Sequence, residues 1–289
     1  MSKVLESEPS LPDSVERARC SLEGLSVGDS FGETFFGHPD VVEGLIAQRA
    51  LADRTWNYTD DTLMAMSVFS VLRQYGYIDQ PALARSFAER YESTRGYGPA
   101  MHSLLWEIKC GEDWAERAQS QFGGQGSFGN GAAMRVAPVG AFYAHDLDAV
   151  VEQAARSSVV THTHPEAIAG AIAVAVAAAQ ACRLRITAAP NRSEFLDLVL
   201  PYVPESEVRS KIRQARDMTA TASVQFAVSV LGNGFGVSAQ DTVPFALWCA
   251  AERLSNFEEA LWLTVSGLGD RDTTCAIVGS IVVLYTGIE

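Results

Sequence analysis

Two short stretches of this 289-residue chain each place two carboxylates where an apolar helix is predicted to begin. The first stretch is "NYTDDTLMAM" (57–66) and the second is "GLGDRDTTCAIVGS" (267–280). One acidic residue at a helix start is explained by capping and by the positive end of the helix, worth about 0.3 to 2 kcal/mol. The second carboxylate in each stretch exceeds what capping needs, so we consider ligand chemistry.

The side chains at these two helix starts share one property, because all of them offer hard oxygen ligands. They are Thr59, Asp60, Asp61, Asp270, Asp272 and Thr273. A ligand set without His or Cys is typical of magnesium and manganese sites. Four carboxylates held close together repel one another unless cations lie between them, and without metal at least one should have a raised pKa. Two divalent ions would balance four negative charges. Two unrelated capped helices remain the alternative.

The composition describes a globular protein, with 47% hydrophobic and 20% charged residues and a net charge of -13. Nucleic acid is an unexpected partner, since binding to phosphate backbones depends on clustered Lys and Arg. The five cysteines are odd in number, scattered, and form no Cys-x-x-Cys pair, which indicates reduced core residues of a cytoplasmic protein.

No targeting or membrane segment is predicted. The N-terminal "MSKVLESEPSLPD" has no hydrophobic run, and we expect residues 1–10 to form a flexible tail. The most apolar window (167–182) is too short to span a bilayer and is about half alanine, so it predicts a buried helix.

Apolar residues recur at spacings of three and four along most of the chain, and sustained alternation with period two is nearly absent. We therefore predict an all-α protein of a dozen or so helices, packed as one compact orthogonal multi-helix domain over 11–289 with the metal site at helix N-termini. The polar stretch 189–194 is predicted to be a connecting loop. The predicted helical segments are 14–36, 60–75, 80–92, 131–144, 147–159, 165–184, 205–230, 241–254, 257–265 and 272–285.

Glycine gathers in two places, "FGGQGSFGNGAAMR" (122–135) and "LGNGFGVSAQD" (231–241), each just before an apolar helical stretch. Backbone without side chains, followed by a helix N-terminus, can present N–H groups to an anion. Both segments are candidate ligand loops. The alternatives are a flexible connection for the first and a helix C-cap with a turn for the second.

Five motifs together resemble the ADP-ribosylglycohydrolase family, the group that contains the dinitrogenase reductase-activating glycohydrolase. They are "GLSVGDSFG" (24–32), "TDDT" (59–62), "GNGAAMRVAPVG" (129–140), "THTHPEAIAGAIAVA" (161–175) and "GDRDTTCAIVG" (269–279). The resemblance implies an all-α fold with a binuclear Mg²⁺ or Mn²⁺ centre that hydrolyses ADP-ribose from modified proteins, with ADP-ribose as product and no membrane partner.

The resemblance also implies roles for individual residues at the metal site. Thr59, Asp60 and Asp61 would supply ligands from one helix start, and the other helix start would supply Asp270, Asp272 and Thr273, with Arg271 pointing away. The paired metals would hold the ribose hydroxyls and set a water against the anomeric carbon. Either Asp60 or Asp270 would take the proton from that water.

The remaining family positions would bind the substrate. The resemblance implies a diphosphate cradle at Gly129, Asn130, Gly131 and Ala132. It also implies a histidine at the pocket rim, His162, whose neutral imidazole could donate to a phosphate or ribose oxygen. His164 is expected to be a capping residue. Asp29 would orient the metal ligands from behind, with a solvated helix aspartate as its alternative, and Phe235 would stack on a base.

Two departures from the family pattern affect the expected linkage. Several relatives have a glutamate where this chain has Phe36, and the nearest glutamate here is Glu33. The chain also stops at Glu289, where relatives commonly continue. Since an arginine acceptor leaves as a guanidinium whereas a serine alkoxide needs a proton, we expect the arginine linkage to be preferred. Open alternatives are a serine, small-molecule or nucleic-acid linkage, and a non-catalytic ADP-ribose-binding module.

Overall fold

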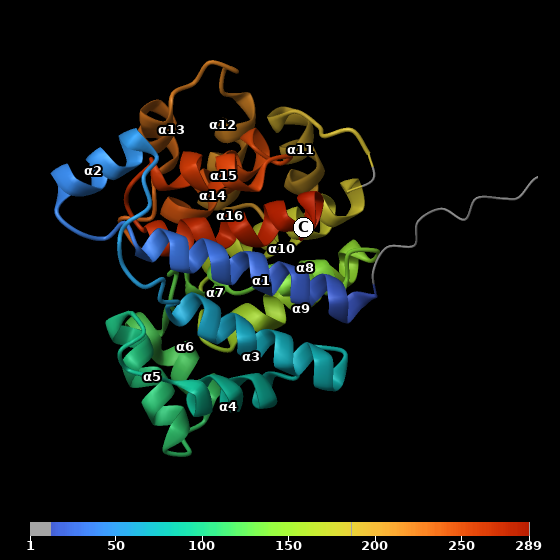
Figure 1. Ribbon diagram of the computed structural model, residues 1–289. Helices are drawn as coiled ribbons and strands as arrows, with labels where there is room; N and C mark the ends of the chain where they lie inside the picture. The colour runs from blue at the N-terminus through green and yellow to red at the C-terminus, as the bar shows by residue number, and fades with distance from the viewer. Residues whose placement is uncertain (1–12, 186, 289) are drawn as a thin grey trace, which may run out of the picture.

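The Asp13 carboxylate starts the first helix by accepting a hydrogen bond from the Glu16 amide at 2.8 Å. From there the computed structural model, which describes residues 13–185 and 187–288, runs from helix to helix (Figure 1). The tail expected at 1–10 lies outside the described residues. The helices are α1 (Ser14–Glu33), α2 (Pro39–Gln48), α3 (Asp60–Tyr75), α4 (Gln80–Arg90), α5 (Pro99–Lys109), α6 (Trp114–Gly124), α7 (Gly131–Met134), α8 (Ala137–Phe142), α9 (Leu147–Val159), α10 (Pro165–Leu184), α11 (Arg192–Val199), the 3-10 helix η1 (Leu200–Tyr202), α12 (Glu207–Asp217), α13 (Val224–Leu231), α14 (Ala239–Glu252), α15 (Phe257–Val265) and α16 (Arg271–Thr286).

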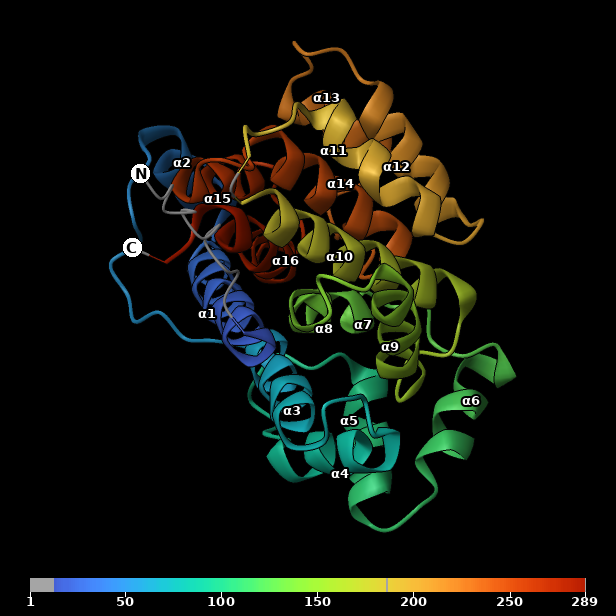
Figure 2. The same cartoon turned by 90° about the vertical axis from the view of Figure 1, so that its right-hand side faces the viewer.

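The prediction of an all-α domain is confirmed. Within the described residues there is no β-strand, and the sole extended pairing is an isolated antiparallel bridge between Gly129 and Ser238. Helices α3 to α6 lie on one side of the molecule and α11 to α14 on the other, with α1, α10 and α16 between them (Figures 1 and 2). One large hydrophobic cluster extends across these helices.

Helix α10 lies at the centre of this arrangement (Figure 2). His164 caps it by accepting a hydrogen bond from the Glu166 amide at 3.1 Å, which confirms the expected capping role. In the described part of the chain this is the one helix long and apolar enough to cross a membrane, but 83% of its most apolar window is buried inside the protein. The small alanine side chains let neighbouring helices approach closely, so α10 is a core helix.

Glycines let α1 lie directly against α16. A Cβ atom added to Gly28 would lie 2.1 Å from the Cys275 carbonyl oxygen, and one on Gly32 would lie 2.2 Å from that of Arg271. Both distances are far below contact distance, so only glycine permits this approach. The first motif of the sequence therefore serves helix packing, and this packing brings the C-terminal half of α1 to the first turn of α16.

Several helix boundaries differ from the prediction. The segment 131–144 is two short helices, α7 and α8, and 205–230 is divided into α12 and α13. Helices α2, α5 and α6 were not predicted; each is short, and α2 and α5 begin with a proline in the first turn. The predicted loop 189–194 is in part the start of α11, where Asn191 and Glu194 form a reciprocal capping box.

Candidate metal centre

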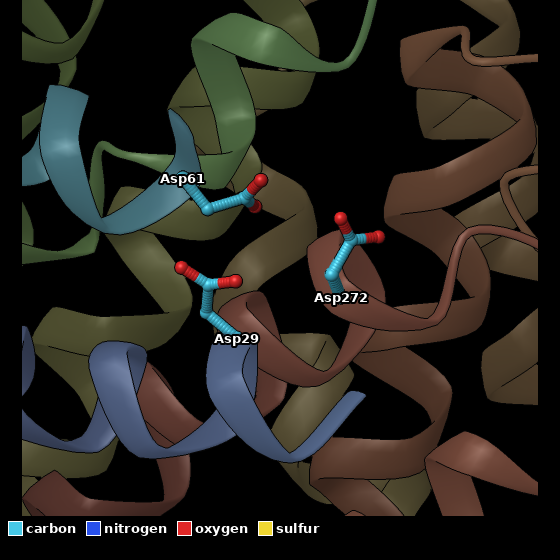
Figure 3. A group of neighbouring side chains, drawn as sticks. All are labelled: Asp29, Asp61 and Asp272. Carbon is cyan, nitrogen blue, oxygen red and sulfur yellow. The ribbon is translucent and has the colours of Figure 1, made fainter. Parts of the chain in front are cut away.

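Three aspartates from three helices converge on one point, Asp29 and Asp61 buried and Asp272 partly buried. Asp29 comes from α1, Asp61 from the first turn of α3 and Asp272 from the first turn of α16, and one oxygen of each lies within 4.8 Å of the others. Figure 3 shows the three carboxylates directed toward a common space. The structure thus brings the two acidic stretches together, so they are not two unrelated capped helices.

Asp29 holds the start of α3 in place. Its carboxylate accepts hydrogen bonds from the Thr59 amide at 2.9 Å and the Thr59 hydroxyl at 2.9 Å. It also accepts from the Thr62 amide at 3.1 Å and the Thr62 hydroxyl at 2.5 Å. Asp29 is fully buried, so the alternative of a solvated helix aspartate is wrong. These contacts fix the backbone on either side of Asp60 and Asp61, and the role of Asp29 in orienting metal ligands stays a prediction.

Asp61 and Asp272 each keep one oxygen without a partner. The Thr273 hydroxyl donates to Asp61 Oδ2 at 3.3 Å, and the Thr59 oxygen, whose one hydrogen is directed to Asp29, lies 3.1 Å from the same atom. Oδ1 of Asp61 is buried and accepts no hydrogen bond. Oδ1 of Asp272 is likewise buried and accepts no hydrogen bond. Buried carboxylate oxygens normally have partners, because losing water without replacement costs free energy. Two such oxygens, next to threonine hydroxyls and with no nitrogen or sulfur ligand, fit a hard divalent cation.

Burial and mutual repulsion together raise the pKa values of these carboxyl groups. Burial is the largest cause of the raised pKa at Asp61 and at Asp272, and neighbouring aspartates add to it. Burial also raises the pKa of Asp60 to about 7, with Asp29 and Asp270 as additional causes. Two unit charges 4.8 Å apart repel by about 3 kcal/mol at an effective dielectric constant of about 20. The cluster therefore needs either protons or cations.

The other two predicted metal ligands lie in different surroundings. The Asp60 amide donates to the Arg95 carbonyl at 2.7 Å, and its carboxylate lies beside Gly96. Asp270 occupies the N-cap position of α16, and its Oδ2 accepts a hydrogen bond from the Asn130 side-chain amide at 2.7 Å. Asn130 thus connects the first glycine loop to the acidic cluster, a link that the sequence did not predict.

The first glycine loop does not offer all four of the amides expected for a diphosphate cradle. The Gly129 amide donates to the Ser127 hydroxyl at 3.2 Å, and the Asn130 amide donates to the Val237 carbonyl at 3.3 Å. The amides of Gly131 and Ala132 begin α7, where first-turn amides have no partner within the helix. The expected cradle is therefore reduced to these two backbone donors.

His162 is not a rim residue. His162 is 3% exposed, and its ring lies beneath the first glycine loop. A Cβ atom on Gly131 would lie 2.9 Å from the His162 ring, so glycine is needed there to seat the imidazole. The expected position at the rim is wrong because the chain that follows α9, which ends at Val159, buries His162.

The second glycine loop (232–236) packs on the start of α16. The Asp270 amide donates to the Asn233 carbonyl at 3.1 Å, and a Cβ atom on Gly234, where φ is +88°, would lie 2.5 Å from Asp270 Cβ. Asp241 fixes the loop by accepting from the Gly236 amide at 2.7 Å. Phe235, the predicted base-stacking residue, is 83% exposed on this loop beside the acidic cluster.

Comparison with known proteins agrees with this geometry. The ADP-ribosylglycohydrolase family model matches residues 10–289. The chain belongs to the ADP-ribosylglycohydrolase family. An ADP-ribosylhydrolase named ARH3 from Xenopus tropicalis is 30% identical over 315 residues, covering 95% of this chain and 88% of that protein. ARH3 from Homo sapiens is 28% identical over 324 residues, covering 96% and 87%.

Two further comparisons concern linkage and fold. The ADP-ribosylarginine hydrolase Tri1 from Pseudomonas putida is 25% identical over 291 residues, covering 95% of this chain and 72% of that protein. A solved chain described as an ADP-ribosylglycohydrolase-related protein complex aligns with a TM-score of 0.64 at 23% identity, covering 95% of this chain and 89% of that chain. The second comparison shows that the two chains share a fold. The family places this protein among the glycosidase-type hydrolases.

The family position at which a glutamate is absent lies beside the acidic cluster. Phe36 is partly exposed, and the Arg271 guanidinium lies over its ring at 5.1 Å. Arg271 thus contacts Phe36, and within the described part of the chain it forms no ion pair with Asp270 or Asp272. Glu33 lies one helical turn away, and burial raises its pKa, an effect that the Arg54 charge opposes only in part. Arg54 also donates to the Glu33 and Phe36 carbonyls, so it ties this segment together.

Sequence reasoning missed several residues that shape the site, and each had only a weak signal. Thr62 was part of the quoted "TDDT" motif but was assigned no role. Asn233 and Asp241 lie in the second glycine segment as ordinary turn residues. Arg135 ends the first glycine segment, and nothing in the sequence indicates that its side chain is fully buried.

Proposed function

We propose that this ADP-ribosylhydrolase is metal dependent and cleaves the N-glycosidic bond between ADP-ribose and an arginine side chain of a modified protein. The observation that carries the metal dependence is the pair of buried, unpartnered oxygens on Asp61 and Asp272. A divalent Mg²⁺ or Mn²⁺ ion bound there supplies positive charge that orients ribose hydroxyls and acidifies a water molecule. We propose that two such ions bind at this site.

The chain's own residues have separate tasks in this proposal. Asp61 and Asp272 hold the ions, and the hydroxyls of Thr59 and Thr273 complete the oxygen set. Asp29 keeps the first turn of α3 in register through its hydrogen bonds to Thr59 and Thr62. The metal-binding groups lie at the starts of α3 and α16, and Asp29 lies near the C-terminal end of α1, so helices position all of them.

Asp60 is the proposed proton acceptor. Oδ2 of Asp270 is held by the Asn130 amide, whereas the Asp60 carboxylate has no hydrogen bond from a side chain among the described residues. A free carboxylate can accept a proton from water without first breaking a contact. In this assignment Asp270 acts mainly to fix the glycine loop. Turnover of Asp60→Asn should then fall further than turnover of Asn130→Ala, which loosens Asp270 without removing a charge.

The arginine linkage is proposed because the leaving group must match the groups around it. A departing guanidinium is already a cation, whereas a departing serine oxygen needs a proton donor. Phe36 supplies no proton, and Glu33 is partly buried against Arg54. The name of the Pseudomonas putida relative, an ADP-ribosylarginine hydrolase, supports this choice.

The test is release of ADP-ribose from two peptides that differ only in the linked residue, arginine or serine. Each is assayed with Mg²⁺, with Mn²⁺ and with EDTA. We expect metal-dependent release that is faster from arginine. Faster release from serine would show that the serine linkage is preferred over arginine. Release only from a small-molecule or nucleic-acid conjugate would show that the acceptor is not a protein side chain. Binding without turnover would indicate a non-catalytic module.

Cellular location is a further proposal. The five cysteines are free, and Cys182, Cys249 and Cys275 are buried in the core. Reduced buried thiols are common in cytoplasmic proteins, so a cytoplasmic location is proposed. Fractionation of cells that produce the protein would test it.

A further inference from the structure

Arg135 is a buried cation that has no carboxylate in direct contact among the described residues, although the Asp60 charge acts on it at longer range. Its residue is 0% exposed, and its guanidinium lies over the Phe87 ring at 4.4 Å. Among the described residues it forms no ion pair; Nη2 donates to the Ser157 carbonyl at 3.1 Å and to the Thr161 hydroxyl at 2.8 Å. Burying a charge that has no ion pair costs free energy of folding. We therefore expect the hydrogen bonds of this side chain to have a function.

The contact with Thr161 determines which way that hydroxyl can point. A guanidinium can only donate hydrogen bonds, so the Thr161 oxygen must act as acceptor toward Arg135. The single hydroxyl hydrogen of Thr161 is then available for another partner. Nδ1 of His162 lies 2.7 Å from the same oxygen, and the described residues provide no other acceptor for that hydrogen.

The direction of these hydrogen bonds determines the tautomer of the His162 imidazole. If the Thr161 hydroxyl donates to Nδ1, this nitrogen carries a lone pair and the ring proton is on Nε2. Burial, assisted by the nearby Arg135 charge, lowers the pKa of His162 to about 3, so the ring is neutral. A neutral imidazole with its proton on Nε2 has one donor, and its direction is set by the fold.

Nε2 faces the first glycine loop. Cβ atoms built on Gly129 and Gly131 would lie 3.2 and 3.0 Å from Nε2, so the absence of side chains leaves this nitrogen facing the loop backbone. The loop is also the segment whose Gly131 and Ala132 amides begin α7. The Nε2–H group is therefore a donor held against the backbone of this loop.

We propose that Arg135 and Thr161 are positioning residues that hold His162 as its Nε2–H tautomer, with this N–H directed at an anionic oxygen of the ligand in the first glycine loop. The ligand class is a nucleotide diphosphate, and this part rests on the proposed function. The tautomer itself does not, because it is a property of the ligand-free protein.

The first experiment measures the tautomer without any ligand or turnover. Long-range proton–nitrogen correlation spectra of the imidazoles are recorded on the ¹⁵N-labelled full chain, and His162→Gln identifies which signals belong to His162. We expect the Nε2–H pattern in the wild type and in Thr161→Ser, which keeps the hydroxyl. Thr161→Val has nearly the same shape without the hydroxyl, and it should lose that pattern.

Two further variants separate this role from general packing. Arg135→Met removes the donors while keeping a long side chain, and it should produce a mixture of tautomers. Ser158→Ala is the matched control, because the Ser158 hydroxyl donates to the His162 carbonyl at 2.9 Å and does not touch the ring. It should leave the pattern unchanged. If Arg135→Met does not fold, the comparison of Thr161→Val with Thr161→Ser decides.

The second experiment measures binding of ADP-ribose by calorimetry in the presence of Mg²⁺. Loss of an N–H donor to a charged oxygen should weaken binding about tenfold or more in Thr161→Val, and Thr161→Ser should restore most of it. A wild-type His162 with its proton on Nδ1, or a Thr161→Val protein that keeps both the Nε2–H pattern and the affinity, would overturn the proposal. Absence of hydrolysis, by contrast, would count against the proposed function only.

Discussion

Replacing Asp61 by Asn should stabilise the metal-free protein while removing its metal response. Asp61 is buried beside Asp29 and Asp272, and its Oδ1 has no partner. Asn has the same shape, so its oxygen can still accept a hydrogen bond from the Thr273 hydroxyl. Its amide nitrogen replaces the unpartnered oxygen and removes one negative charge from the cluster.

The expected size follows from the cluster geometry. At 4.8 Å and an effective dielectric constant of about 20, each ionised pair costs about 3 kcal/mol, and Asp61 takes part in two such pairs. A carboxyl group in the cluster can avoid this repulsion by binding a proton at pH 8. Each unit by which its pKa is shifted corresponds to about 1.4 kcal/mol. We expect a net gain of about 1 to 3 kcal/mol for Asp61→Asn, which is a rise of about 2 to 10 °C in Tm for a domain of this size.

The assay is thermal unfolding followed by circular dichroism at pH 8, for both proteins in EDTA and in saturating Mg²⁺. In EDTA, Asp61→Asn should melt above the wild type. In Mg²⁺ the order should reverse, because metal at about a hundredfold over its Kd adds about 2.7 kcal/mol per site to the wild type. Asp53→Asn, a substitution at an exposed aspartate, is the control and should show no reversal. A variant less stable than the wild type in EDTA would refute the reasoning.

Three other predictions address the site and the helix packing. In EDTA the Tm of the wild type should fall as the pH rises from 5.5 to 8, because Asp60 has a folded-state pKa raised to about 7 and its proton is lost across that window; Mg²⁺ should remove this slope. Asp272→Asn should lower turnover by at least about a hundredfold, whereas Arg271→Ala, whose guanidinium stacks on a ring, should cost only about a fewfold in kcat/KM; equal losses would contradict the proposed geometry. Gly28→Ala should destabilise the protein by about 1 to 3 kcal/mol or more in urea unfolding, because its Cβ would meet the Cys275 carbonyl oxygen, while Gly44→Ala in α2, with open space around it, should be neutral or slightly stabilising.

Local features of the sequence were sufficient for the fold class and for part of the site. Spacings of three and four predicted the α-helices, and α3, α9, α10 and α15 have the predicted bounds. The oxygen-only composition at the two helix starts predicted a hard-metal site, and Asp61 and Asp272 do converge. These features are local, since helix periodicity, capping and ligand type depend on residues a few positions apart.

What the tertiary structure decided involves residues far apart in the chain. Asp29 joins the acidic cluster because Gly28 and Gly32 let α1 rest on the first turn of α16. Asn130 reaches Asp270 across 140 positions, and Arg135 reaches His162 through Thr161. Such contacts depend on which helix faces meet and how closely, and a single sequence does not state this. The same packing placed His162 beneath the glycine loop, where its neighbours rather than its position in the motif determine its protonation.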